Sequence, residues 1–420
     1  MNKFMNWLEK SFAPKLQKVT NLTWIVVIKD SLMQILPFIL IGSIFCCGAI
    51  LNDFIPWLPS FWTPFGWTMG KLSLMVSFLI PFNYCEKKRY RKQRILAGIS
   101  GMLLFMMFVE PEIVADNAAG SFGQGHTAYG AGGMFVAIFA GIIAGLIFGA
   151  FAKFSFFKED SAIPDFVRQW FDALLPVGIV ICIGWVVALI ANIDVYGIIS
   201  GLFMPLQSFA NTWYGMTIIL FLYCFIYSMG ISTWVLTPMS EPIKLQAITA
   251  NLAMVAAGTA TAASLNLFTE TFIYTCYLWV GGVGATLSLV ILMCRSKSTE
   301  LKALGRACLI PGIFNINEPV VFGAIAWNPL LMVPMWLQGI ILPLMTWFFC
   351  KVLPIVPIPR IQFELWYCPY PISTFISTQG SIIGVLFAIV TFIVSGLIWY
   401  PFFKTYEKQK MAEEAAKLEA

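Results

Sequence analysis

The chain has 420 residues, of which 59% are hydrophobic and 11% are charged, and its mean hydropathy is +0.81. Soluble globular chains carry roughly twice that charged fraction, so the composition excludes an ordinary water-soluble protein and indicates a protein that crosses a membrane several times. The net charge of +5 does not indicate a nucleic-acid partner, because the basic residues lie in connections beside apolar segments.

Residues 1–21 lack the pattern of a signal peptide. Charged residues interrupt the apolar ones at the spacing of a helix with two faces; these are Lys3, Glu9, Lys10, Lys15 and Lys18. The pattern predicts an amphipathic helix that lies on the membrane surface.

Ten apolar runs follow, each of roughly the 20 residues that a helix needs to cross a bilayer. They cover about 22–50, 66–84, 95–110, 130–152, 174–192, 213–229, 245–265, 268–293, 328–350 and 381–402. The weakest is 245–265, whose Ala, Thr and Gly content also fits part of a re-entrant hairpin. The runs predict an all-α polytopic membrane protein.

The basic residues predict the orientation of these spans. With the N-terminus inside, the Lys and Arg clusters after the second, fourth, eighth and tenth runs all lie in the cytoplasm. The alternate connections 51–65, 111–129 and 193–212 contain no Lys or Arg, and only 351–380 dilutes the pattern. Because cytoplasmic loops carry the excess of basic residues, we expect both termini in the cytoplasm.

Three stretches are neither clean spans nor simple loops. Residues 158–173 are typical of an amphipathic connector, and residues 230–244 place Glu241 between two prolines. The third, residues 307–329, contains residues 311–323, here called the signature loop. Polar, Pro-interrupted segments within apolar surroundings are the usual pointer to a transporter binding site. The tail from residue 404 to residue 420 is charged and Ala-rich, which predicts a solvated helix.

The signature loop reads Pro-Gly-Ile-Phe-Asn-Ile-Asn-Glu-Pro-Val-Val-Phe-Gly. A carboxylate at bilayer depth costs a few kcal/mol, so Glu318 needs either partners or a function. Proline and glycine break the helix there, and broken backbone at membrane depth is tolerated only inside protein or beside a water-filled cavity. The loop therefore predicts a polar binding site within a membrane domain.

This loop resembles the signature loop of enzyme IIC, the sugar-translocating membrane subunit of the bacterial phosphotransferase system, in its lactose/cellobiose (diacetylchitobiose) family. The resemblance extends over nearly the whole chain and is strongest over 268–329. It includes Tyr129-Gly130-Ala131-Gly132-Gly133, Ile163-Pro164-Asp165, Gly281-Gly282-Val283-Gly284 and Tyr400-Pro401-Phe402-Phe403-Lys404.

The chain departs from the family pattern at three places around the expected substrate chamber. Ser232 stands where the family has a histidine after Gly-Ile. Ala324-Ile325-Ala326 replaces the family's Leu-Pro-Ile, and Tyr367-Cys368-Pro369-Tyr370-Pro371 replaces its Val-Pro-Trp-Thr region. These departures bear on substrate identity rather than on fold.

The resemblance implies a permease that translocates a β-linked disaccharide, such as cellobiose, lactose or chitobiose, across the bacterial inner membrane. The resemblance also implies that a separate cytoplasmic phosphocysteine IIB subunit phosphorylates the sugar. It implies a homodimer, with scaffold and dimer contacts in 22–212, the sugar in 213–404 and a cytoplasmic tail at 405–420. The alternative is a facilitator or secondary transporter on the same fold without phosphorylation, which Ser232 favours and the intact signature loop disfavours.

Glu318 is the candidate catalytic residue. Its carboxylate can accept two sugar hydroxyls, or take a hydroxyl proton while a phosphoryl group arrives; the alternative is a structural group that caps a broken helix or pairs with lysine. The resemblance makes Asn315 a sugar contact, whereas Asn317 either binds sugar or satisfies loop backbone. The remaining candidate sugar-binding residues are Ser232, Gly282 and Glu241.

Each of these further candidates has a second interpretation. Gly282 either lets backbone approach the sugar or lets two helices pack closely. Glu241 is either a sugar or gating group, or a partner of Lys244. Trp234, Trp327 and Trp366 either stack on a pyranose ring or anchor the chain at the interface.

No cofactor or metal site is expected. The 10 cysteines form no CxxC or metal-ligand spacing and fall mostly within apolar runs. His126 is the single histidine and falls on the outer side, so it cannot carry a phosphoryl group from a cytoplasmic donor. The chain has no Walker-type phosphate loop, and the phosphoryl relay is therefore expected on separate proteins.

Overall fold

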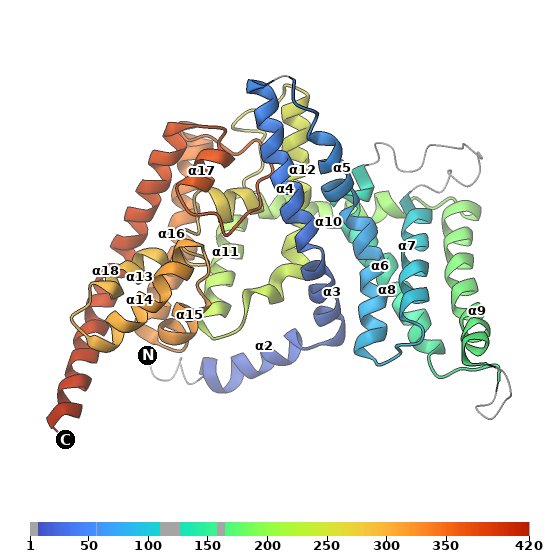
Figure 1. The fold of residues 1–420 in the computed structure, drawn as a ribbon, viewed down its shortest axis with the longest axis horizontal. Coiled ribbons are helices and arrows are strands. Elements are labelled where there is room, and N and C mark those ends of the chain that lie inside the picture. Colours follow the sequence, from blue (N-terminus) through green and yellow to red (C-terminus); the bar gives the residue numbers. More distant parts are fainter. Residues whose placement is uncertain (1–6, 56, 110–126, 158–163, 420) are drawn as a thin grey trace.

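The computed structural model describes residues 7–55, 57–109, 127–157 and 164–419, and within these ranges the regular secondary structure is helical (Figure 1). The N-terminal helices lie at one end of an elongated molecule and the C-terminal helices at the other. His126 and the first part of the predicted connector 158–173 fall outside the described residues. The all-α prediction is confirmed.

The described part of the N-terminal segment is helical, as predicted. It forms η1 (Leu8–Phe12) and α2 (Ala13–Thr20) along one edge of the molecule. The Phe12 ring lies 5.9 Å from the ring of Phe225 in α11 (Trp213–Ser228), so this helix packs against the C-terminal half. Its place on the membrane surface stays a prediction.

The N-terminal half is built of α3 (Thr23–Gln34), α4 (Leu36–Phe54), α5 (Trp62–Thr68), η2 (Met69–Lys71), α6 (Leu72–Lys87), α7 (Arg94–Val109), η4 (Thr127–Tyr129), η5 (Ala131–Gly133), α8 (Met134–Phe151), α9 (Asp165–Gly184) and η6 (Trp185–Ile190). Helices α6, α7 and α8 pack against one another. Gly101 permits the approach of α7 to α6, because a Cβ there would lie 2.5 Å from the carbonyl oxygen of Ser77. Small residues at such contacts are typical of membrane helix packing.

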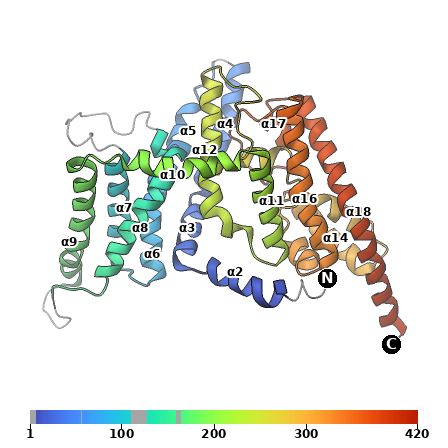
Figure 2. The ribbon, with the colours of Figure 1, turned by 180° about the vertical axis from the view of Figure 1, so that it is seen from behind.

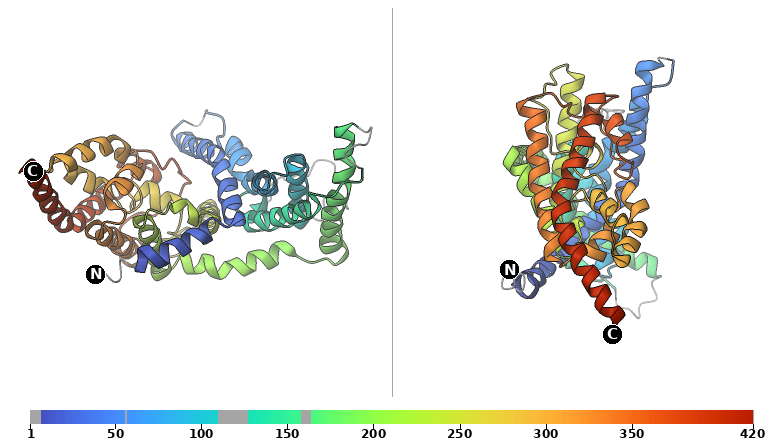
Figure 3. Two further views of the ribbon diagram at one scale, coloured as in Figure 1. Left: turned by 90° about the horizontal axis from the view of Figure 1, so that it is seen from below. Right: turned by 90° about the vertical axis from the view of Figure 1, so that its left-hand side faces the viewer.

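Two boundaries in this half were predicted wrongly. The connector and the fifth span are one helix from Asp165, because residues 172–175 contain no glycine or proline that would end it. The connection 193–212 is itself a helix, α10 (Val195–Ala210), which begins where the Asp194 carboxylate accepts a hydrogen bond from Gly197 N at 2.7 Å. Helix α10 meets α11 at 87° and runs along one side of the molecule between its two ends (Figure 3).

The C-terminal half contains more broken elements. After α11 come η7 (Thr233–Leu236), α12 (Thr237–Ala256), η8 (Thr271–Cys276), α13 (Leu287–Cys294), α14 (Thr299–Ile313), α15 (Glu318–Val320), η9 (Val321–Ile325), α16 (Pro329–Trp347), η10 (Phe348–Val352), α17 (Ile372–Ser377) and α18 (Ile382–Glu419). Helix α12 begins before the predicted run 245–265 and ends within it, which agrees with the hairpin alternative for that run. Pro238 fits in its first turn because no helical N–H is lost there.

The prediction of one continuous span at 268–293 is wrong. The segment forms two short helices, η8 and α13, joined by turns. Three glycines in the turns, Gly281, Gly282 and Gly284, have φ values of +85°, +93° and +83°. A right-handed helix cannot pass through residues in this left-handed region.

Six helices within the described residues are long and apolar enough to cross a membrane, or seven if the bent pair α10 and α11 counts as one span. They are Thr23–Gly42, Trp62–Lys87, Ala131–Phe151, Val167–Ile190, Pro329–Val352 and Ile382–Ala416. Helix α7 is a shorter apolar helix. Within the described residues, the ten predicted runs therefore do not all correspond to continuous membrane-length helices, because part of the C-terminal half consists of broken segments.

The predicted tail helix exists, but it is not solvated all round. Helix α18 continues to Glu419, and its acidic side chains reach the chain just before α14. Glu407 accepts hydrogen bonds from Ser296 Oγ and Lys297 N, at 2.7 and 2.8 Å. Glu414 accepts from Ser298 Oγ at 2.7 Å and from the backbone N–H of Glu300 at 2.9 Å. The tail therefore packs against the start of α14.

Candidate functional site

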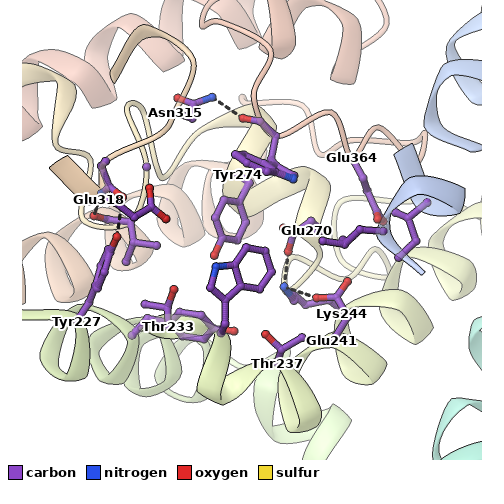
Figure 4. A pocket seen from close by; sticks show the side chains of 18 residues that line it. Tyr227, Thr233, Thr237, Glu241, Lys244, Glu270, Tyr274, Asn315, Glu318 and Glu364 are labelled. Carbon is purple, nitrogen blue, oxygen red and sulfur yellow. Dashed lines mark hydrogen bonds and ion pairs between the residues drawn. The ribbon is translucent and has the colours of Figure 1, made fainter. Parts of the chain in front are cut away.

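A cavity opens between α11, α12 and the signature loop. Together with the open space at its mouth it has a volume of about 760 Å³. It is lined by Leu36, Ile39, Tyr223, Tyr227, Thr233, Trp234, Thr237, Glu241, Lys244, Glu270, Tyr274, Gly282, Val283, Asn315, Asn317, Glu318, Glu364 and Trp366. Figure 4 shows Glu318 on one side, Lys244 with its carboxylates on the other, and Tyr274 between them.

Glu318 is the first residue of the short helix α15, directly after the turn that the signature loop makes. Its side chain is exposed to the cavity. No hydrogen bond or ion pair joins it to another side chain within the described ranges, so the pairing with lysine is not seen there. A carboxylate in this position has both oxygens available to accept hydroxyl hydrogens.

Asn315 holds the signature loop against two other segments. Its backbone has φ +60°, a conformation that asparagine tolerates better than most residues. Its Oδ1 accepts from Gly281 N at 2.8 Å, and its Nδ2 donates to the carbonyls of Trp366 and Cys368 at 2.6 and 3.2 Å. Both N–H groups are thus used, and only one lone pair of Oδ1 is left for a sugar.

Asn317 has a similar role toward the glycine turns. Its Nδ2 donates to Val283 O at 2.8 Å, and its Oδ1 accepts from the Tyr227 hydroxyl at 3.4 Å. This agrees with the alternative in which Asn317 satisfies loop backbone. Gly282 lies against it, since a Cβ at Gly282 would lie 2.5 Å from the Asn317 Cγ. The close packing at this glycine is between two loops rather than two helices.

A buried ion cluster forms the opposite wall. Lys244 Nζ lies 2.8 Å from Glu241 Oε2 and also forms an ion pair with Glu270, and the lysine side chain is 5% exposed. Glu241 therefore pairs with Lys244, as the alternative interpretation had it, and lines the cavity as well. Glu364 lies on the same wall and accepts a hydrogen bond from Gln362 Nε2 at 2.7 Å.

The sequence analysis missed Glu270, Glu364 and Tyr227. A signal for the first was available: Glu270 is an ionisable residue inside an apolar run, and such residues are functional candidates by default. Glu364 lies in a connection of low charge between two predicted spans. An ionisable residue outside a span is a weaker indication of a functional site. Tyr227 carried no signal, because tyrosine is common in membrane helices.

The structure brings only some of the remaining candidates to the cavity. Ser232 is exposed and is not among the lining residues, whereas its neighbours Thr233 and Trp234 are. Trp366 also lines the cavity. Trp327 does not, and packs instead against a separate apolar cluster that contains Met332.

Carboxylate, hydroxyl and aromatic groups around one cavity fit an uncharged polyhydroxylated ligand, since aromatic faces cover its apolar side and carboxylates accept its hydroxyls. The cavity is formed by broken helices inside a bundle of membrane-length helices, as in membrane transporters. The fold and the site thus define a helical transporter of polar solutes.

Comparison with known proteins gives the family. The model of the phosphotransferase system EIIC family matches residues 29–339, and the chain belongs to this family. It is 30% identical to the cellobiose-specific EIIC component of Geobacillus stearothermophilus over 442 aligned positions, which cover 99% of this chain and 97% of that protein. It is 27% identical to the lactose-specific EIICB component of Staphylococcus epidermidis, covering 100% of this chain and 73% of that protein.

A solved structure agrees with this assignment. The crystal structure of the transporter ChbC, the IIC component of the N,N'-diacetylchitobiose-specific phosphotransferase system, superposes with a TM-score of 0.84 at 28% identity. The match covers 97% of this chain and 99% of that one. The chain is therefore a multi-pass membrane permease of the phosphotransferase system.

Proposed function

We propose that this permease carries a β-linked disaccharide of the cellobiose, lactose or chitobiose type across the bacterial inner membrane. Similar proteins support this substrate class, because they align with nearly the whole chain and are named for cellobiose, lactose and N,N'-diacetylchitobiose. The observation that carries the proposal is the cavity, which is lined by Glu318 together with the aromatic side chains Trp234, Tyr274 and Trp366.

The residues around the cavity have different roles in sugar binding. Glu318 accepts hydroxyl hydrogen bonds from the sugar, and the aromatic rings cover the less polar faces of its pyranose rings. Asn315 and Asn317 position the signature loop through their backbone hydrogen bonds, and Gly282 permits the close approach of Asn317. Asn315 adds one acceptor lone pair toward the sugar, and Glu241 with Lys244 closes the far wall.

Phosphoryl transfer requires a cytoplasmic donor. We place a separate phosphocysteine IIB subunit there, and the EIICB names of the lactose-specific relatives support such a partner. As the donor's phosphorus–sulfur bond breaks and a phosphorus–oxygen bond forms at the sugar, Glu318 takes the hydroxyl proton. Lys297 lies just before α14, Lys302 and Arg306 lie within it, and together these cations attract an acidic donor.

The topology completes the proposal. Both termini lie in the cytoplasm, the half at 22–212 forms the scaffold and the homodimer contact in the lipid bilayer, and the half at 213–404 encloses the sugar. Basic residues support this orientation because they collect in alternate connections.

The experiment measures sugar binding and phosphorylation separately. Purified protein is titrated calorimetrically with cellobiose, lactose and N,N'-diacetylchitobiose, with the monosaccharide glucose as the control. Proteoliposomes then receive phosphorylated IIB subunit and the sugar that binds. We expect one disaccharide to bind and its sugar phosphate to appear. Binding of no disaccharide contradicts the substrate class, and transport without any sugar phosphate favours the facilitator that Ser232 suggests.

A further inference from the structure

A basic cavity lies far from the sugar site, at the other end of the molecule. It is formed by the connection between α6 and α7, the end of α8 and the start of α9, and it includes about 1170 Å³ of space with its mouth. The described cations that line it are Arg89, Arg91, Lys92, Lys153 and Arg168.

The described carboxylates near this cavity are fewer than its described cations. Asp172 lines it and accepts a hydrogen bond from the backbone N–H of Phe156 at 2.9 Å. Glu86 lies beside it and pairs with Arg91 at 3.1 Å. Arg168 apart, the four described cations Arg89, Arg91, Lys92 and Lys153 exceed these two carboxylates by two positive charges, which favours an anionic ligand.

An apolar groove lies along α9 and begins at Leu174, two residues after Asp172 of the basic cavity. It is lined by Leu174, Leu175, Gly178, Ile179, Cys182, Ile183, Val186 and Val187. Leu175 and Val186 are 38% and 46% exposed, and no atom lies within 4 Å of the place where a Cβ on Gly178 would sit. Figure 2 shows α9 at the end of the molecule, beside α7 and α8.

The cavity and the groove share one face of α9. Residues at spacings of four and three lie on one side of a helix. This stripe contains Arg168, Asp172, Leu175, Ile179, Cys182 and Val186. From Asp172 to Val186 the helix rises about 20 Å at about 1.5 Å per residue, which exceeds the roughly 15 Å of hydrocarbon in one leaflet.

We propose that an anionic phospholipid binds here, with its phosphate headgroup in the basic cavity and an acyl chain along the α9 groove. A water-soluble anion would leave the groove uncovered, and a neutral lipid would leave Arg89, Lys92 and Lys153 without a described counter-ion. Exposed aromatic side chains at the same level, Phe154, Phe156 and Trp170, are typical of the membrane–water interface. The lipid joins α9 to the α6–α8 bundle.

The test uses native mass spectrometry of the purified full-length protein with phosphatidylglycerol or phosphatidylcholine. Lys92→Gln with Lys153→Gln removes two exposed cations from the cavity, and Lys87→Gln with Lys88→Gln removes two exposed cations outside it. Each basic residue near an anionic headgroup contributes about 1 kcal/mol. We expect phosphatidylglycerol affinity to fall about 30-fold in the first variant and less than about threefold in the second.

Gly178→Phe tests the groove without changing charge, since the new ring fills the groove. Gly201→Phe on α10 is its control, because that position is equally open. We expect phosphatidylglycerol retention to fall only in Gly178→Phe, and excess inorganic phosphate not to displace the lipid.

Three results would overturn the proposal. Equal losses in the two lysine variants would mean general charge attraction. Displacement by inorganic phosphate with no effect of Gly178→Phe would mean a site for a free anion. A change in dimer mass in Gly178→Phe with unchanged lipid retention would mean that a second copy of the chain covers the groove.

Discussion

Gly282→Ala tests whether the glycine turns form the frame of the sugar site. Gly282 has φ +93°, where a Cβ costs roughly 1–2 kcal/mol in strain. The added Cβ would also lie 2.5 Å from the Asn317 Cγ, and overpacking of this kind costs roughly 1–3 kcal/mol. We expect the free energy of unfolding to fall by roughly 2–5 kcal/mol, and sugar affinity to fall because Asn317 and the loop beside Glu318 shift.

The matched control is Gly258→Ala. Gly258 also has a left-handed backbone, with φ +69°, but no atom lies within 4 Å of a Cβ built there. It should therefore lose only the strain, roughly 1–2 kcal/mol, and keep its sugar affinity. The assay is denaturant titration in detergent, followed by calorimetric sugar binding. Equal destabilisation of the two variants, with unchanged sugar affinity in Gly282→Ala, would refute this account of the contact with Asn317.

The remaining predictions concern the ion cluster, the donor surface and the topology. Lys244→Met should lower the free energy of unfolding by roughly 3–5 kcal/mol, because it leaves Glu241 and Glu270 buried without their cation; stability equal to wild type in denaturant titration would contradict this. Neutralising the basic residues Lys297, Lys302 and Arg306 together should slow donor-dependent uptake and reduce its dependence on salt, while sugar binding persists. A loss of sugar binding would mean that these residues stabilise the fold instead. On a cysteine-free background, single cysteines at Arg91 and Gln409 should be labelled from the cytoplasm, and one at Gln124 should be labelled from outside. The reverse labelling pattern would contradict the proposed orientation.

The signature loop was recognisable because it is chemically out of place. A carboxylate, two amides and helix-breaking residues inside apolar sequence predicted a polar site within the membrane domain, and Glu318 lines a cavity there. The loop's partners were not predictable in the same way. Asn315 contacts Gly281, 34 residues away, and Trp366, 51 residues away, and no local pattern specifies such pairs.

Apolar length predicted helices better than it predicted their breaks. The long runs at 130–152 and 328–350 each correspond to a membrane-length helix. The run at 268–293 does not, because average hydropathy does not distinguish a span from buried broken backbone; its three glycines were the available signal. Similarly, 193–212 was read as a connection for lack of charge, although its apolar residues form α10.

The central claim is that Glu318 binds the sugar and takes its hydroxyl proton. Glu318→Gln keeps the size of the side chain and one acceptor oxygen but removes the charge and the basic site. A hydrogen bond to a charged group contributes roughly 1.5–3 kcal/mol, so sugar affinity should fall about 10- to 100-fold. Donor-dependent sugar phosphate formation should fall by on the order of 100-fold beyond the binding loss.

The decisive measurement is therefore calorimetric sugar affinity, with sugar phosphate formation from phosphorylated IIB subunit, in wild type and Glu318→Gln. Glu413→Gln, a change of the same kind on the exposed tail, is the control and should leave sugar affinity unchanged. We predict that only Glu318→Gln loses both affinity and phosphorylation. Wild-type affinity and wild-type phosphorylation in Glu318→Gln would contradict the account.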